Sequence, residues 1–233
     1  MRRGFDTTMS NVPSEEEFLA ALDTVRAYLE AENPVEAECT FDFRDGNGPV
    51  PARRHINPDG SEGGWVAETA DVAETARVGP DAVVFGNARV HGNARVHGNA
   101  RVFGHAKVDD NAQVDHAWIS GHAWVFGNAW AYGAVEVSGN ARVHGNARVR
   151  GIARVFGHAQ VGDNAWVYGN AWAYGAAVVS GNARVRGNVR VLSNARVFDD
   201  AHVSGYAQVG DNAWVCGAAR ISGNTELRSG FHC

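Results

Sequence analysis

Tryptophan and arginine recur at one position of a short repeat. Their indole and guanidinium groups are the side chains of this sequence best suited to bind a ligand or a partner. All seven tryptophans and eleven arginines lie between a small residue, usually alanine, and an aliphatic residue, as in AWA (129–131) and ARV (147–149). In an extended segment alternate residues point to opposite sides, so this middle residue faces solvent or a partner. Guanidinium groups bind phosphate oxygens in a bidentate manner, and indole rings stack on planar groups. Outward-facing side chains of these two types stabilise an exposed sheet through cross-strand contacts, and they are also suited to anion recognition.

A period of six residues positions these side chains. An aliphatic residue recurs at twenty-eight positions from Val66 to Leu227, with one five-residue step from Val114 to Ile119. Each small-x-aliphatic segment predicts a short strand, and the Gly-Asn, Gly-Asp or Asp-Asn pairs between them predict turns with positive φ. A six-residue unit cannot bury its own apolar face, so neighbouring units must stack. The absence of a heptad pattern excludes a coiled coil for this tract.

The tract GNARVHGNARVHGNARV (86–102) resembles the hexapeptide-repeat family, and the resemblance covers roughly three quarters of the chain. It implies an all-β solenoid, a left-handed parallel β-helix with three hexads per coil and about nine coils, over residues 63–233. Most enzymes of that family are acyltransferases that use a CoA-type donor and a catalytic histidine, and the resemblance favours a homotrimer. Regular GNARV tracts are also similar to those of phage and prophage proteins, which adds a phage protein that sequesters a host nucleotide signal as one expectation.

With three hexads per coil, every third outward residue shares a face, and one face has no acidic residue at this position. It reads Arg77, Arg95, Gln113, Trp130, Arg148, Trp166, Arg184, His202 and Arg220. We expect Trp130, Arg148, Trp166 and Arg184 to form a cation–π ladder on successive coils. The candidate ligand site comprises this ladder together with His202 and Arg220. Three interpretations stay open: a ladder that only stabilises the sheet, a site for a small anion or nucleotide, and a subunit interface.

The histidines and the regularity of the repeat bear on catalysis. Seven of the ten histidines lie at two turn positions of the repeat, where asparagine, phenylalanine, tyrosine or arginine stand in other hexads, so we expect no metal site. We also expect no catalytic residue and no cofactor, because the repeat has no loop excursion and no histidine has an evident carboxylate to orient it. The sequence thus favours a non-catalytic binding or scaffold protein. An acyltransferase that uses an acyl-CoA and a purely structural assembly protein are the alternatives.

Residues 1–62 differ from the repeat and carry 6 basic and 13 acidic residues. Ser14 and Glu17 form a capping-box pattern, and the helix that follows has an apolar stripe of Phe18, Leu22, Val25 and Leu29. Alternation over Val35–Phe43 predicts a strand. We expect a small α+β cap that closes the first coil, with a docking segment as the alternative. At the other end only Arg228–Cys233 follow the last hexad, so we expect the last coil either to pair with another molecule or to be covered by Phe231.

Overall composition limits the partners. The formal charge of −5, from 21 basic and 26 acidic residues, gives no general polyanion signature, so we expect no long nucleic acid as partner. No apolar run approaches the length of a membrane span, and three widely separated cysteines argue against a disulfide framework. These features predict a cytoplasmic protein, in a bacterial host if the chain is phage-encoded. The expected partners are further copies of the chain and a small anionic ligand or a host protein.

Overall fold

The computed structural model describes residues 14–32 and 39–233, which belong to two compact units divided between Cys39 and Thr40. The first unit contains the helix α1 (Glu15–Glu32). Its start is the expected capping box: the Ser14 N–H donates to Glu17 Oε2 at 2.9 Å, and the Glu17 N–H donates to Ser14 Oγ at 3.2 Å. The described side chains of the apolar stripe are exposed, namely Phe18, Leu22 and Val25. The side chain of Leu29 and residues 35–38 of the strand expected over Val35–Phe43 lie outside the described residues, and the described part of that strand forms β1 (Thr40–Asp42).

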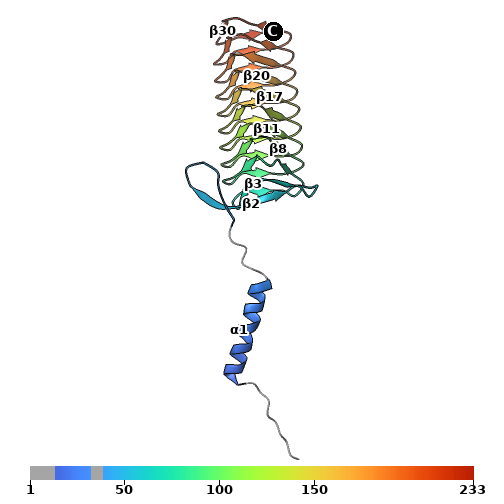
Figure 1. Cartoon of the computed structure of the whole chain (residues 1–233). Coiled ribbons are helices and arrows are strands. Elements are labelled where there is room, and N and C mark those ends of the chain that lie inside the picture. The colour runs from blue at the N-terminus through green and yellow to red at the C-terminus, as the bar shows by residue number, and fades with distance from the viewer. Residues whose placement is uncertain (1–13, 33–38) are drawn as a thin grey trace, which may run out of the picture. The chain divides into compact units, whose positions relative to one another are not determined.

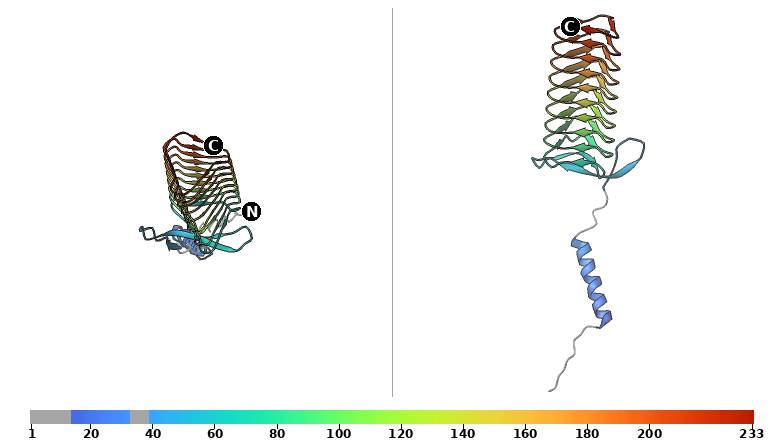
Figure 2. Two further views of the ribbon diagram at one scale, coloured as in Figure 1. Left: turned by 90° about the horizontal axis from the view of Figure 1, so that it is seen from above. Right: turned by 180° about the vertical axis from the view of Figure 1, so that it is seen from behind.

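The second unit confirms the expected left-handed parallel β-helix of about nine coils. Figure 1 shows its coils stacked from β3 to β30, and Figure 2 shows the same stack from behind. Successive coils pair through parallel strands, and three sheets form the three faces. Each sheet takes its strands from every third hexad, as the sequence predicts, because each strand pairs with the strand one coil later.

The first face is a twelve-stranded sheet that begins with an antiparallel hairpin and continues with parallel strands. Its strands are β1 (Thr40–Asp42), β2 (Pro49–Ile56), β3 (Glu62–Ala67), β6 (Val83–Val84), β9 (Arg101–Val102), β12 (Trp118–Ile119), β15 (Glu136–Val137), β18 (Arg154–Val155), β21 (Trp172–Ala173), β24 (Arg190–Val191), β27 (Gln208–Val209) and β30 (Glu226–Leu227).

The other two faces are parallel throughout. The ten-stranded sheet contains β4 (Asp71–Val72), β7 (Arg89–Val90), β10 (Lys107–Val108), β13 (Trp124–Val125), β16 (Arg142–Val143), β19 (Gln160–Val161), β22 (Val178–Val179), β25 (Arg196–Val197), β28 (Trp214–Val215) and β31 (Phe231–His232). The nine-stranded sheet contains β5 (Arg77–Val78), β8 (Arg95–His97), β11 (Gln113–Asp115), β14 (Trp130–Tyr132), β17 (Arg148–Gly151), β20 (Trp166–Gly169), β23 (Arg184–Gly187), β26 (His202–Val203) and β29 (Arg220–Ile221).

The core of the β-helix is built from the small and aliphatic residues of the repeat. From Ala76 to Val215, each of these residues is at most 1% exposed. The residue between them points outwards on every strand, as alternation requires. The apolar interior therefore fixes which side chains line the three faces.

The turns explain the glycines and the residues that replace them. Gly139 has a φ of +69°, and a Cβ atom built on it would lie 3.0 Å from the backbone of Gly157 on the next coil. Aspartates occupy the same place elsewhere with positive φ, at Asp110, Asp163 and Asp199. Each of their carboxylates accepts a hydrogen bond from the backbone N–H of a glycine on the next coil, at 2.9–3.1 Å.

The five-residue step leaves the pairing of the coils intact. His116 has a φ of +55° and forms the turn where most hexads have glycine. Trp118 after the step stays in register with Arg101 on one side and Glu136 on the other. The deletion therefore shortens one turn and forms no loop.

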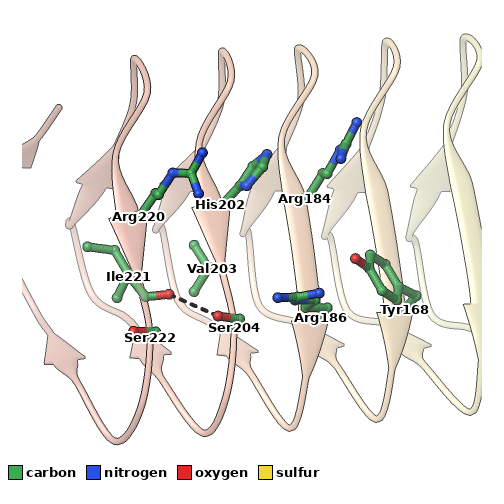
Figure 3. Close-up of a pocket in the computed structure, with 9 residues that line it drawn as sticks. All are labelled: Tyr168, Arg184, Arg186, His202, Val203, Ser204, Arg220, Ile221 and Ser222. Atoms are coloured by element: carbon green, nitrogen blue, oxygen red, sulfur yellow. Dashed lines mark hydrogen bonds between the residues drawn. The ribbon is translucent and has the colours of Figure 1, made fainter.

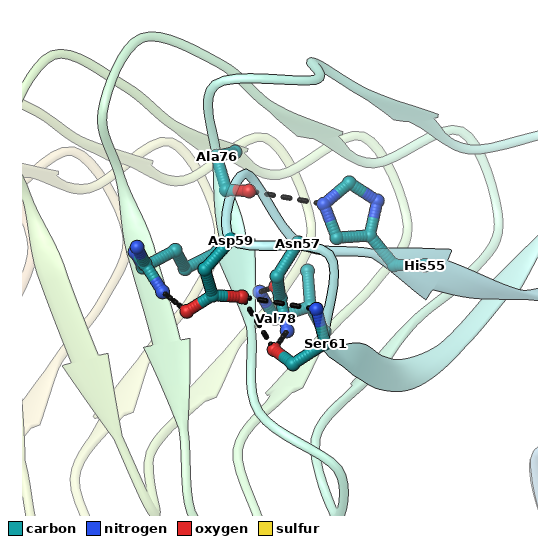
Figure 4. Close-up of polar contacts among 7 residues, drawn as sticks. His55, Asn57, Asp59, Ser61, Ala76 and Val78 are labelled. Atoms are coloured by element: carbon teal, nitrogen blue, oxygen red, sulfur yellow. Dashed lines mark hydrogen bonds and ion pairs between the residues drawn. The ribbon is translucent and has the colours of Figure 1, made fainter.

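Side chains of the β2–β3 hairpin close the first edge of the nine-stranded sheet (Figure 4). The His55 Nε2–H donates to the backbone oxygen of Ala76 at 2.9 Å, and Asn57 Oδ1 accepts from the Val78 N–H at 2.9 Å. Asp59 pairs with Arg77, the β5 residue between Ala76 and Val78. The edge of β5 thus has partners for its backbone groups before the first coil is complete.

The last coil ends differently from the sequence expectation. Phe231 extends the ten-stranded sheet beside Trp214 and is 73% exposed, so it does not cover the core. Cys216 and Cys233 form a disulfide that ties the last residue to the preceding coil. The chain has no disulfide framework, as expected, but the sequence analysis missed this pair. Cys39 is a free, exposed cysteine.

Candidate functional site

The outward residues of the nine-stranded sheet form two rows. The first row contains the six residues of the candidate site, which the register places on successive strands from Trp130 to Arg220. The second row lies two residues further along the chain on each coil and was missed by sequence reasoning. It contains Tyr132, Arg150, Tyr168 and Arg186 and continues with Ser204 and Ser222. We call the two rows from Trp130 to Ser222 the arginine face.

The first row is the cation–π ladder that the sequence predicts. The Arg148 guanidinium carbon lies 5.3 Å from the ring centroid of Trp130 and 5.0 Å from that of Trp166. Arg184 lies 5.9 Å from the Trp166 ring on its other side. These distances confirm a ladder in which guanidinium and indole groups alternate along the β-helix.

The second row continues this alternation. Arg150 lies 4.8 Å from the Tyr168 ring centroid and 5.5 Å from the Trp166 ring centroid. Its Nη1 atom donates to Tyr132 Oη at 3.5 Å. Arginine on one strand is thus held between aromatic residues on the two neighbouring strands.

Stacking within the ladder limits what the indoles can do. Trp166 has Arg148 on the preceding coil and Arg184 on the following coil, so guanidinium groups cover both faces of its ring. A nucleobase stacks on a free ring face. We therefore assign Trp166 to the support of its neighbouring arginines and not to base stacking.

A hollow of about 370 Å³ opens where the second row changes from large to small side chains. Ser204 and Ser222 form its floor, and Arg186 and Tyr168 precede them on the same row (Figure 3). The other row contributes Arg184, His202 and Arg220, the last three residues of the candidate site (Figure 3). Trp130, Arg148 and Trp166 lie on earlier coils and do not line it.

The hollow is strongly positive. Three arginines line it, and its lining includes no acidic residue. Among the described residues, none of these three arginines takes part in a salt bridge. The Ser204 hydroxyl makes only a long contact of 3.5 Å with the backbone oxygen of Ile221. Guanidinium and hydroxyl donors are thus available to a ligand.

Other hollows are larger but less positive. One of about 550 Å³ on the twelve-stranded sheet is lined by Arg154, Trp172 and Arg190 among others. There Arg154 pairs with Glu136 at 3.5 Å, which neutralises part of the charge. Another of about 610 Å³ contains Asp42 and Asp81 beside Arg101. The hollow on the arginine face is therefore the most positive of these three.

The histidines correct one sequence expectation. Two of them do have a carboxylate partner: His91 Nε2 lies 2.9 Å from Asp71, and His116 Nδ1 lies 2.7 Å from Asp115. Neither lines the hollow on the arginine face. In the described part of the chain, no group of three or more histidine, cysteine or acidic side chains is placed to hold a metal ion.

Comparisons with known proteins agree with the solenoid architecture. Residues 159–175 match the family described as YdcK Beta solenoid repeat. No curated protein matches the sequence significantly. In the described residues, no helix is long and apolar enough to cross a membrane.

Two solved structures similar to this chain are UDP-N-acetylglucosamine O-acyltransferase (LpxA) from Moraxella catarrhalis and LpxA from Acinetobacter baumannii. The first is 14% identical with a TM-score of 0.37, and the match covers 68% of each chain. The second is 12% identical with a TM-score of 0.35, and covers 65% of this chain and 67% of that one. The family description and the observed coils agree on a β-solenoid built from short repeats.

Proposed function

We propose that this protein is a non-catalytic binding protein for a small anionic ligand, which it holds in the hollow of the arginine face. The observation that supports this most directly is the group of three arginines around one hollow without a carboxylate among its lining. Arginine side chains that lie close together repel one another unless a negative group binds between them. A bound anion supplies that charge.

The donor set favours phosphate groups as the recognised part of the ligand. Arg186 and Arg220 present planar guanidinium forks, which match the geometry of phosphate oxygens. Ser204 and Ser222 add hydroxyl donors to the lining of the hollow. A volume of about 370 Å³ accommodates a small molecule with one or two phosphate groups. Capture of a nucleotide signal in a phage-infected host is one form of this function, with recognition through the phosphates.

Calorimetric titration of the purified chain with pyrophosphate and ADP tests the proposal. The wild-type protein is expected to bind both ligands, and Arg186→Gln with Arg220→Gln is expected to abolish binding without loss of the folded state. The matched control is Arg142→Gln with Arg196→Gln, which removes the same charge from the outward position of the ten-stranded sheet.

Three results would count against this function. Absence of binding by the wild-type chain overturns it, and equal losses in the two double variants reduce it to non-specific attraction. Thiol release from an acyl-CoA that disappears in His202→Gln would instead identify an acyltransferase, since His202 is the histidine in the hollow. Native mass spectrometry of the same samples reports whether the binding species is a homotrimer, another oligomer or a monomer.

A further inference from the structure

The positive charge of the arginine face extends well beyond the hollow. Arg148 and Arg150 lie on β17, Arg184 and Arg186 on β23, and Arg220 on β29. From Trp130 to Ser222 neither row contains an acidic residue, although the whole chain has a charge of −5. The acidic residues lie elsewhere, and 13 of the 26 precede residue 63. The face is therefore a local cationic surface on an acidic protein.

The arginines recur at regular intervals in two neighbouring rows of the sheet. β17, β20, β23, β26 and β29 pair in direct register, so arginine-bearing strands lie two coils apart. With about 4.8 Å between paired strands, this spacing is about 9.6 Å, and β17 and β29 are about 19 Å apart. Two arginines on one strand are two residues apart, or about 6.6 Å. The cationic track therefore runs parallel to the axis of the β-helix.

The aromatic rungs between the arginines hold the guanidinium groups in place. Trp166 contacts Arg148 and Arg184, and Tyr168 contacts Arg150. Preorganised side chains lose less conformational entropy when a ligand binds. A rigid row of cations suits a ligand whose charges are also in a row.

We propose that the arginine face binds a linear phosphate polymer, inorganic polyphosphate, along the axis of the β-helix from the hollow to β17. This inference rests on the proposed function, because the hollow holds the end of the same chain. Polyphosphate carries closely spaced negative charges and no bases, so its binding requires no exposed face of an aromatic ring. Single-stranded nucleic acid gains affinity by stacking bases on aromatic side chains, and the ladder already covers both faces of Trp166.

The test compares phosphate chains of increasing length with the full-length protein. Pyrophosphate occupies only the hollow, which already includes the arginines of β23, whereas longer chains also reach Arg148 and Arg150 of β17. We expect affinity to rise with length until the polymer spans the track and then to level off. Arg148→Gln with Arg150→Gln should weaken binding of long polyphosphate about tenfold and leave pyrophosphate binding unchanged, because these residues do not line the hollow. The same variant should reduce the slope of log affinity against log salt concentration by about two.

The outcomes separate this inference from the proposed function. If pyrophosphate binds and affinity does not increase with chain length, the polymer inference is overturned and the small-anion function stands. If neither ligand binds, both fail. If oligothymidylate of the same charge binds as tightly as polyphosphate, the face recognises charge alone and the inference is again overturned. Unchanged pyrophosphate binding in the Arg148/Arg150 variant also shows that the variant is folded.

Discussion

Asn57 Oδ1 accepts a hydrogen bond of 2.9 Å from the backbone N–H of Val78, twenty-one residues further along the chain. Val78 lies on β5, the first strand of the nine-stranded sheet, so no earlier coil can supply this acceptor. The amide of Asn57 also donates to Ser61 Oγ at 3.2 Å. One buried side chain thus takes the place of a missing strand.

Removal of this side chain should therefore destabilise the start of the β-helix. We expect Asn57→Ala to lower the free energy of unfolding by about 1–3 kcal/mol, because it leaves a buried N–H without an acceptor. Urea denaturation followed by circular dichroism measures this change. Asn140→Ala, at an exposed turn in the middle of the stack, is the control. Equal losses in the two variants would show that Asn57 has no special role at the edge.

Gly139 tests the close approach of the turns. Gly139→Ala combines a positive φ with a Cβ only 3.0 Å from the backbone of Gly157, whereas Gly223→Ala has a similar φ of +68° and nothing within 4 Å. The Gly223 variant should lose about 1–2 kcal/mol from the backbone conformation alone, and the Gly139 variant should lose more. Gly139→Asp should recover part of the loss, since Asp110 and Asp163 bond the next coil from this place. If the two alanine variants are equally stable, the contact between coils is unimportant.

The disulfide between Cys216 and Cys233 should stabilise the last strand. The two residues are 17 apart in sequence, and closure of a loop of about this length is worth roughly 3 kcal/mol in the chain-entropy description. Cys233→Ser should therefore increase hydrogen exchange in β31 and lower the melting temperature. A reductant should have the same effect on the wild-type chain and no further effect on the variant. Cys39→Ser is the control, and a loss of stability there would contradict this assignment.

Much of the fold follows from the period of six, because each residue of a short strand points either into the narrow core or out of the β-helix. The same period placed Trp130, Arg148 and Trp166 on one face in the correct order. It did not reveal the second row, because the residue after the aliphatic position belongs to a turn in most hexads. Only where the strand extends, as in β17 and β23, do Arg150 and Arg186 face outwards.

Contacts between distant hexads were harder to foresee. The partners of His55 and Asn57 lie twenty-one residues away, and nothing in the local pattern of residues 49–62 identifies them. The disulfide did leave a signal: its two cysteines are 17 residues apart, which is close to one coil of three hexads. Applied to the cysteines, the period would have placed Cys233 opposite Val215, the residue next to Cys216 in the sequence. The hollow depends on the serines of the second row and was therefore not predictable before that row was known.

His97 should make the stability of the β-helix depend on pH. Burial lowers the pKa of its imidazole below the usual 6.5, the nearby Arg95 and Arg77 lower it further, and the Asp115 carboxylate opposes them. The unfolded chain therefore takes up a proton first as the pH falls through 6.5, so stability decreases from that point until the folded-state pKa is reached. We expect His97→Gln to lose less stability than the wild type between about pH 7.5 and pH 5. Urea midpoints at both pH values measure this difference, with His158→Gln at an exposed turn as the control. An identical pH dependence in His97→Gln and the wild type would show that this imidazole does not contribute.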